Sequence, residues 1–303
     1  MRGPAIANLL VALLALAIGG CGGSGSSDDP STSSDFDAAR AFRDLKAQVK
    51  LGPRPSGSPA AARAANLIAR SLRAAGVDEV EVQRPYANVV GTVPGSEPGF
   101  VVVGAHYDTK DGIPGFVGAN DGASGVAVLL ELARTLPRPL PGPAVELVAF
   151  DAEETRGERA FEVDGTRGSR QFVDDARAGG EQGAPPLDQL RAMVLFDMVG
   201  DCELAIPRER YSDAGLYDLF AEASQEITDS EAPFEGMTGP ILDDHVPFLE
   251  AGIPALDLID FDYGPGPTPG GWWHTPEDTL EHVCPASLNA VGEAALRAIP
   301  RIR

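Results

Sequence analysis

The sequence has few cysteines, few tryptophans and few positive charges. Its 303 residues include 3 Cys and 2 Trp, and 24 Lys and Arg stand against 45 Asp and Glu, a formal net charge of -21 at pH 7. Charge of that sign repels the phosphates of nucleic acids and anionic lipid headgroups. The composition therefore argues against a nucleic-acid-binding protein, and it favours cationic partners such as the free amino groups of peptides.

The sequence contains few cysteines, so they constrain the fold little. Apart from Cys21, only Cys202 and Cys284 are present. An oxidising compartment would allow them to pair, but two cysteines far apart in sequence carry no information about geometry. A disulfide and two separate buried thiols are both compatible with the sequence.

The first 34 residues are typical of a targeting segment. Residues 1–21 carry one Arg, an apolar stretch poorly suited to a membrane span, and small residues before Cys21, as in a signal peptide. The end of this segment, "IGGC", resembles the bacterial lipoprotein cleavage motif, which would place a lipid on Cys21. An ordinary signal peptide or a single-span anchor are the alternatives.

Residues 22–34 are mostly Gly, Ser, Thr and Asp, which predicts a flexible tether. We expect an extracytoplasmic protein, secreted or lipid-anchored to the cell membrane.

Residues 35–303 are expected to form one catalytic domain, because 43% of the chain is hydrophobic and nothing demands a second core. Apolar spacing and turn formers predict its helices and strands. Helices are expected over 36–50 and 59–75, after Asp121, and over 169–178, 213–227 and 285–299; strands over 79–84, 87–93, from 100, and over 144–150, 192–200 and 253–259.

The alternation of apolar strands and helices predicts an α/β fold. We expect a three-layer sandwich in which helices cover both faces of a mixed, mostly parallel sheet. The first two strands are short with a turn-like break between them, so we expect them to pair antiparallel. Residues 262–273, rich in Pro and Gly, are expected to form a loop.

Side chains with metal-binding chemistry follow several predicted strands or enter a helix. They are His106, Asp108, Asp121, Asp151, Glu153, Glu154, Asp197 and His274. Because open α/β sheets bind ligands beyond the carboxyl ends of their strands, we expect most of them at one edge. Crowded carboxylates need a compensating cation, and mixed imidazole and carboxylate ligands suit Zn²⁺.

Two adjacent carboxylates end the apolar run "LVAFDAEE". Consecutive residues that leave a strand point in different directions, so Glu154 can bind a metal while Glu153 reaches the open coordination position as a proton carrier. An acidic pair after a strand is by itself more typical of a solvated turn. The nearby "HYD", "AND" and "WWHT" favour the metal interpretation.

Seven motifs occur in the order seen in a known family. They are "GAHYDTK", "VGANDGASGVAVLLELA", "FDAEE", "GSRQF", "LFDMVG", "DDHVPFLEAGIPAL" and "WHTPEDT". From about Leu51 onward the chain resembles the zinc exopeptidase superfamily, which holds aminopeptidases and glutaminyl-peptide cyclotransferases, and in particular its bacterial glutaminyl cyclase-like members. The resemblance implies a zinc enzyme that acts on the N-termini of peptides or proteins, and we expect a monomer.

The resemblance also implies the metal ligands. Asp121, Glu154 and His274 match the ligands of a catalytic zinc. His106 and Asp197 match residues that hold a second zinc in the aminopeptidases, where Asp121 bridges the two ions. One zinc is expected for a cyclase and two for an aminopeptidase.

The remaining roles follow from the same resemblance. Asp108 matches a carboxylate that orients His106, and Glu153 matches the general acid/base. In a cyclase, the α-amine of an N-terminal Gln attacks its own side-chain amide, and Glu153 passes a proton to the departing ammonia. Asp243 would share hydrogen bonds around the leaving group with Asp197. In an aminopeptidase, Glu153 would instead take a proton from water.

Features outside the ligand set separate the two activities. "DDH" at 243–245 and Trp273, which would wall the substrate pocket, resemble the cyclases. By contrast, "GANDGASG" resembles the aminopeptidases. Leu242 stands where a Gln is common before the acidic pair, which is a smaller mismatch. The loop "TRGERAFEVDG" lacks the tryptophan of the animal cyclases. We favour the cyclase, with the aminopeptidase as the alternative and a non-catalytic binding lipoprotein as a third reading.

Three aromatic side chains near these motifs are expected to have structural roles. His245 is expected to form structural hydrogen bonds, His282 to face solvent, and Trp272 to cap the core.

Overall fold

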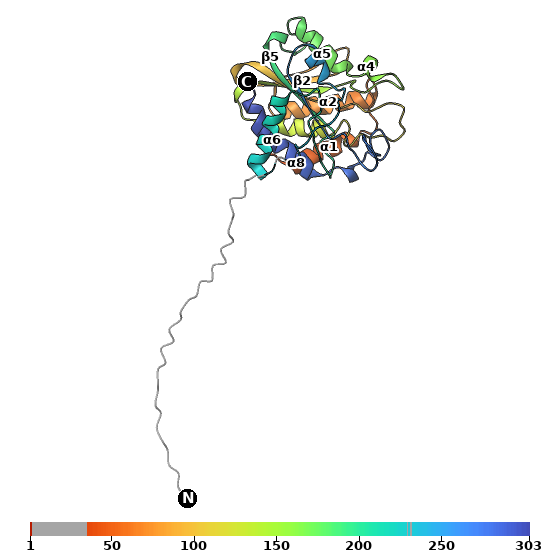
Figure 1. Cartoon of the computed structure of the whole chain (residues 1–303), viewed down its shortest axis with the longest axis vertical. Helices are drawn as coiled ribbons and strands as arrows, with labels where there is room; N and C mark the ends of the chain where they lie inside the picture. Colours follow the sequence, from red (N-terminus) through yellow and green to blue (C-terminus); the bar gives the residue numbers. More distant parts are fainter. Residues whose placement is uncertain (2–34, 229, 231) are drawn as a thin grey trace. The chain divides into compact units, whose positions relative to one another are not determined.

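A six-stranded mixed sheet crosses the middle of the computed structural model (Figure 1). Its order is β1-β2-β4-β3-β5-β6, with β1 antiparallel to β2, β2 antiparallel to β4, and the other four strands parallel. The strands are β1 Asp78–Val82, β2 Val89–Val93, β3 Gly95–His106, β4 Leu140–Phe150, β5 Leu190–Asp197 and β6 Ala255–Ile259. The predicted antiparallel pair and the mostly parallel sheet are both confirmed.

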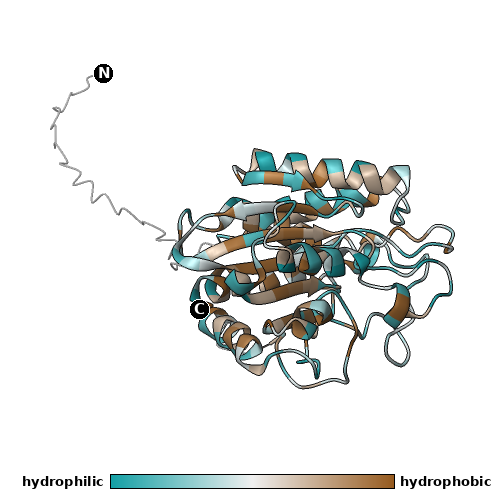
Figure 2. Cartoon of the chain, turned by 90° about the horizontal axis from the view of Figure 1, so that it is seen from above, coloured by the Kyte–Doolittle hydropathy of each residue, from teal (hydrophilic) through white to brown (hydrophobic). Residues whose placement is uncertain are grey.

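The central strands are apolar on both faces because alternate residues enter two different cores. In β3, Val101, Val103 and Ala105 join one hydrophobic cluster, while Val102 joins the other. Side chains alternate across a strand, so a strand buried on both sides needs a continuous apolar run. Figure 2 shows these hydrophobic strands between helices on either side.

Helices form a layer on each face, which confirms the three-layer sandwich. The first layer consists of α1 Ala38–Val49, α2 Pro59–Ala74, α3 Ser124–Thr135, α6 Ala214–Thr228 and α8 Pro285–Ala298. The second consists of α5 Arg167–Arg177 and α7 Val246–Glu250. In Figure 1, α6 and α8 lie side by side, and they contact each other.

The start of α2 follows directly from the local sequence. The Ser58 hydroxyl accepts a hydrogen bond from the Ala61 backbone N–H at 3.0 Å, and Pro59 occupies the first helical turn. A serine cap satisfies one of the free N–H groups of the first turn, and proline lacks the N–H that would have no partner there. The helix therefore begins where turn chemistry predicts it.

The predicted elements occur at the expected places, with shifts at their ends. β3 begins at Gly95, before the predicted start at residue 100, and β5 ends at Asp197 rather than 200. The short helices α4 Phe161–Asp164 and α7 Val246–Glu250 and three short 3₁₀ turns were not predicted, because elements this short do not show helical periodicity. The 3₁₀ turns are Leu187–Gln189, Leu280–His282 and Ile299–Arg301.

The structure describes Met1 and residues 35–228, 230 and 232–303. Apart from Met1, the predicted signal segment of 1–21 and the tether of 22–34 lie outside the described residues. Among the helices described, none combines the length and the apolar character that crossing a membrane requires.

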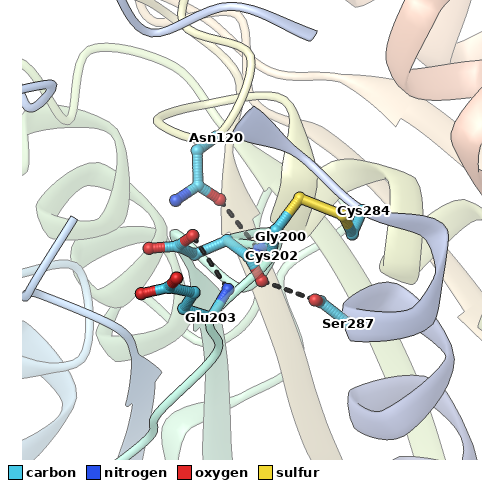
Figure 3. Close-up of a disulfide and its surroundings, with 7 residues drawn as sticks. Asn120, Gly200, Cys202, Glu203, Cys284 and Ser287 are labelled. Atoms are coloured by element: carbon cyan, nitrogen blue, oxygen red, sulfur yellow. Dashed lines mark hydrogen bonds between the residues drawn. A yellow bond between two sulfur atoms is a disulfide. The ribbon is translucent and has the colours of Figure 1, made fainter. Parts of the chain in front are cut away.

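Cys202 and Cys284 form a disulfide, with their Cα atoms 4.8 Å apart. Figure 3 shows that this bond joins the loop after β5 to the start of α8. Beside it, the Gly200 backbone N–H donates a hydrogen bond to Asn120 Oδ1 at 2.8 Å. Of the two possibilities compatible with the sequence, the structure shows the bonded pair, and the linked loop contacts the residue next to Asp121.

Candidate metal centre and active-site pocket

The predicted ligands come from separate segments and meet at the carboxyl edge of the sheet. His106 is the last residue of β3 and Asp197 the last of β5. Glu154 follows β4, Asp121 precedes α3, and His274 lies in the loop after β6. Parallel strands end at the same edge, so residues far apart in the chain become neighbours.

The first ligand group consists of Asp121, Glu154 and His274. His274 Nε2 lies 2.8 Å from Glu154 Oε1 and 3.3 Å from Asp121 Oδ2. Burial alone would lower the pKa of His274, but the two carboxylates raise it to about 10. An imidazole and the oxygen atoms of two carboxylates thus meet at one point.

The second ligand group consists of His106, Asp121 and Asp197. His106 Nε2 lies 3.1 Å from Asp197 Oδ1 and 3.3 Å from Asp121 Oδ1. Burial opposes the charged imidazole, but the carboxylates of Asp197, Asp108 and Asp121 raise the pKa of His106 well above its usual value. Asp121 belongs to both groups, each oxygen facing a different histidine.

These two groups fit zinc. The buried Oδ2 atom of Asp121 has no hydrogen-bond partner, as expected of an oxygen that needs a cation. Imidazole nitrogen together with carboxylate oxygen is a common zinc ligand set. Asp121, Glu154 and His274 would hold one ion, and His106 and Asp197 could hold another with Asp121.

Asp108 makes contacts that the resemblance did not imply. Its Oδ1 accepts a hydrogen bond from the Glu153 backbone N–H at 3.2 Å, and its Oδ2 accepts one from Glu154 N–H at 3.3 Å. His106 Nδ1 is 3.6 Å from Asp108 Oδ1, too long for a hydrogen bond. Asp108 therefore fixes the backbone of both glutamates directly, and it faces His106 only as a nearby charge.

The backbone is strained at the turn that leads from β4 to the two glutamates. Ala152 has a positive φ of 60°, so the chain turns sharply before Glu153. Non-glycine residues in this region cost about 1–3 kcal/mol and cluster at functional sites. His274 itself has φ 51°, and Met198, next to the ligand Asp197, has φ 45°. Strained backbone thus flanks the ligands on three segments.

Glu153 lines the pocket without belonging to either ligand group. Burial raises its pKa well above the usual range for glutamate, and the carboxylates of Glu154, Asp244 and Asp108 raise it further, while His106 lowers it. A carboxyl group with a raised pKa is suited to accept and return a proton.

The pocket is a cavity of about 400 Å³. Trp273 forms part of its wall, with its ring stacked on that of His274 at 3.8 Å between centroids and edge-on to Phe261 at 5.3 Å. Asp243 is also on the wall and is buried. The other apolar or cationic lining residues are Lys110, Phe161, Pro240, Ile241, Leu242 and Ile259.

Asp278 and Arg54 support the site, and sequence reasoning missed both. Asp278 accepts hydrogen bonds from the backbone N–H of Asn120 at 2.8 Å and of Asp121 at 3.1 Å. Arg54 is buried and donates to three backbone carbonyls between His106 and Asp121. Asp278 lies within the quoted motif "WHTPEDT", which was a signal for it, whereas Arg54 lies outside all seven motifs.

Other sequence predictions have mixed outcomes. Asp151 follows β4 but does not line the pocket; it accepts a hydrogen bond from the Ala87 backbone N–H at 3.1 Å. His282 does not simply face solvent, because its ring stacks on Trp272 at 3.5 Å between centroids. Trp272 packs against the small cluster that contains Tyr263, as expected for a residue that caps the core.

The sequence model of peptidase family M28 matches residues 88–299, and the chain belongs to this family. The chain is 32% identical to a glutaminyl cyclase of an Acidobacteriales bacterium, whose crystal structure it matches with a TM-score of 0.75 over 88% of this chain and 94% of that one. That agreement confirms the zinc exopeptidase-like fold.

Curated relatives include both kinds of enzyme named by the resemblance. Glutaminyl-peptide cyclotransferase of Boiga irregularis is 26% identical over 245 residues, 69% of this chain and 64% of that protein. Aminopeptidase YwaD of Bacillus subtilis is 31% identical over 215 residues, 67% of this chain and 41% of that protein. The chain thus spans less than two thirds of the length of these relatives.

Proposed function

We propose that the protein is a zinc-dependent glutaminyl-peptide cyclotransferase, which converts an N-terminal Gln to pyroglutamate and releases ammonia. The observation that carries this proposal is the shared pocket: Glu153, Asp243 and Trp273 line one cavity next to Asp121, Glu154 and His274. An aromatic wall suits the methylene groups of a glutamine side chain, and two further carboxyl groups suit the movement of protons.

Binding and orientation supply much of the rate enhancement in this reaction. The α-amine and the side-chain amide belong to one substrate residue, so holding that residue folded on itself makes the attack intramolecular. A zinc ion held by Asp121, Glu154 and His274 would supply Lewis-acid polarisation of the amide carbonyl. Trp273 and Phe261 would close the apolar side of the substrate and exclude water.

Glu153 moves the proton that the reaction must transfer. A bond forms between the α-nitrogen and the side-chain carbonyl carbon, and the bond from that carbon to the amide nitrogen breaks. Glu153 takes a proton from the attacking amine and delivers it to the departing nitrogen, which leaves as ammonia. Asp243 and Asp197, both on the pocket wall, would hold the leaving group by hydrogen bonds.

An aminopeptidase is the second candidate, and the second ligand group favours it. His106, Asp121 and Asp197 could hold a further ion, and two-ion sites can hold both the substrate and the attacking water. In that reaction Glu153 would take a proton from water instead of from the α-amine, with the same pocket receiving the first side chain. The number of zinc ions therefore separates the two activities.

One assay separates the candidates. Purified protein is incubated with a Gln-Phe dipeptide and with Leu-p-nitroanilide, each with zinc and after chelation, and zinc is counted per chain. Ammonia and a pyroglutamyl product from the first substrate, with one zinc, support the cyclase. Release of nitroaniline, with two zinc ions, supports the aminopeptidase. No turnover of either substrate favours the non-catalytic binding protein.

We further propose that the protein is extracytoplasmic and anchored by a lipid on Cys21, and that residues 35–303 act as one monomeric catalytic domain. The disulfide between Cys202 and Cys284 supports an oxidising compartment. In a bacterial host, the wild-type protein should sediment with membranes and Cys21→Ser should become soluble. Equal distribution of the two would refute the anchor.

A further inference from the structure

A third group of buried ionisable side chains lies outside both ligand groups. It consists of Glu209, His245 and Asp257, all fully buried. Glu209 belongs to the loop between β5 and α6, His245 directly precedes α7, and Asp257 is the middle residue of β6. These residues do not line the cavity, and neither metal binding nor proton transfer as described above uses them.

His245 lies between the two carboxylates. Its Nε2 is 3.4 Å from Glu209 Oε1, and its Nδ1 is 3.8 Å from Asp257 Oδ2. Opposite edges of the ring thus face different carboxylates, so the three cannot share one metal ion. None of these four atoms has a hydrogen-bond partner, so the structural hydrogen bonds expected of the His245 ring are not formed. Each ring nitrogen of His245 is thus paired with one carboxyl group in a part of the interior where ionisable groups without compensation cost several kcal/mol.

The middle residue of this group, His245, lies close to Asp243 in the chain. Asp243 and His245 belong to the same turn, in which the Val246 backbone N–H donates to Asp243 O at 2.9 Å and the Asp244 N–H donates to Asp243 Oδ1 at 2.5 Å. His245 is buried two residues after Asp243, so one short turn carries both the buried ring and a carboxyl group on the cavity wall.

Glu209, at one end of the group, is hydrogen-bonded to the pocket wall. Glu209 Oε2 accepts hydrogen bonds from the backbone N–H of Tyr211 at 2.8 Å and of Ile241 at 3.2 Å. Ile241 lines the cavity together with its neighbours Pro240 and Leu242. One carboxylate therefore holds the wall with one oxygen and faces His245 with the other.

We propose that Glu209, His245 and Asp257 form a buried carboxylate–imidazole–carboxylate triad that positions Asp243 and the adjoining wall at 240–242 for the reaction. The inference rests on the proposed function, because that function places Asp243 at the leaving group. The three residues are positioning residues, since they act on the substrate only through Asp243 and the wall.

The geometry allows the two roles of Glu209 to be separated. In Glu209→Gln, the amide oxygen can replace Oε2 and keep both backbone hydrogen bonds, while the charge opposite His245 is lost. In Glu209→Ala, both are lost. Glu235→Gln is the matched control, because Glu235 is an exposed carboxylate in the neighbouring segment.

The test measures kcat and KM on whichever N-terminal substrate the wild type turns over, together with zinc content and Tm. Glu209→Gln should lower kcat about tenfold per zinc-loaded, folded molecule and leave KM within about twofold. Glu209→Ala should lower kcat as much and also raise KM about fivefold, because the wall is released. Glu235→Gln should match the wild type.

Several outcomes would overturn the triad. One is a wild-type kcat in Glu209→Gln; another is a loss of activity that only follows the folded, zinc-loaded fraction. If Glu209→Ala does not fold, Asp257→Asn replaces it: kcat should fall by a similar factor, and the double variant with Glu209→Gln should lose less than the product of the two. Losses that simply multiply would contradict a shared role.

A crystal structure of Glu209→Gln gives a readout that does not depend on activity. The Asp243 carboxyl group should be displaced relative to the ligand residues, and an unchanged position would refute the inference even if the wild type has no activity on either substrate. Failure of the wild type to cyclise Gln-Phe would refute the proposed cyclase activity, but it would leave this structural comparison intact.

Discussion

Two regions of buried carboxylates differ in what neutralises their charge. In the helical layer, Glu131 of α3 is fully buried, and its oxygens accept hydrogen bonds from Arg40 Nε at 2.7 Å and from Arg134 Nη1 at 3.1 Å. At the carboxyl edge of the sheet, Asp121 instead faces two imidazoles, and its buried Oδ2 has no hydrogen-bond partner. A buried carboxylate that has its own arginines is structural, whereas several that converge on shared histidines indicate a ligand site.

The largest effect should come from the edge of the sheet, at Glu153, the carboxyl group that transfers the proton in the proposed reaction. Glu153→Gln keeps the size of the side chain but cannot accept a proton, so we expect kcat to fall about a thousandfold with zinc content unchanged. Steady-state kinetics and metal analysis check this. Turnover at the wild-type rate would show that Glu153 is not the proton carrier.

The next largest effect should come from the helical layer, and it should be on stability and not on catalysis. Glu131→Gln removes the charge that Arg40 and Arg134 neutralise, so we expect the free energy of unfolding to fall by about 2 kcal/mol. This figure lies below the range for fully buried pairs, because the Arg40 side chain is 39% exposed. Urea titration measures the loss.

The same variant should keep the wild-type kcat per folded, zinc-loaded molecule. A loss of activity without a loss of stability would break the distinction between the two regions, since Glu131 would then affect the site.

A third type of buried carboxylate is paired with a hydroxyl group instead of with arginine or shared histidines. Glu146 of β4 accepts a hydrogen bond from the Thr92 hydroxyl at 2.8 Å. Burial raises its pKa to about 8, while the Thr92 hydroxyl opposes this shift. In the folded protein this group thus remains protonated to a much higher pH than in the unfolded chain.

The sign of the resulting pH dependence follows from that difference. Between the unfolded pKa, about 4.3 for glutamate, and the folded value, the native state holds one proton more than the unfolded state, so stability falls as pH rises. Between pH 5 and 8, the free energy of unfolding of Glu146→Gln should therefore fall by about 1 kcal/mol less per pH unit than that of the wild type. Thermal unfolding of both proteins across that range measures it, and parallel curves would contradict the assignment.

The clustering of the candidate ligands could be predicted from the sequence because most of them follow a strand or enter a helix. His106, Glu154 and Asp197 each come at or just after the end of an apolar run, and parallel strands bring such ends together. The role of Asp108 toward the two glutamates was missed, because a motif shows which residues are present but not which backbone N–H groups a carboxylate meets.

The supporting contacts could not be predicted because they join segments that are distant in sequence. Asp278 accepts a hydrogen bond from a backbone N–H that is 157 residues away, at Asp121. Glu209 meets Ile241 across 32 residues, and nothing in the local pattern marks it as buried. Such pairs depend on how the loops pack against each other, which periodicity and turn chemistry do not describe.

The layered fold, the residue types of the candidate metal ligands and the net negative charge could be predicted from the sequence, because each depends on local spacing, residue type or composition. The folded chain was needed to show that Cys202 and Cys284 pair, that Trp273 stacks on His274, and that Glu209 supports the pocket wall. These depend on distances between segments that meet only when the helices and loops have packed on the sheet.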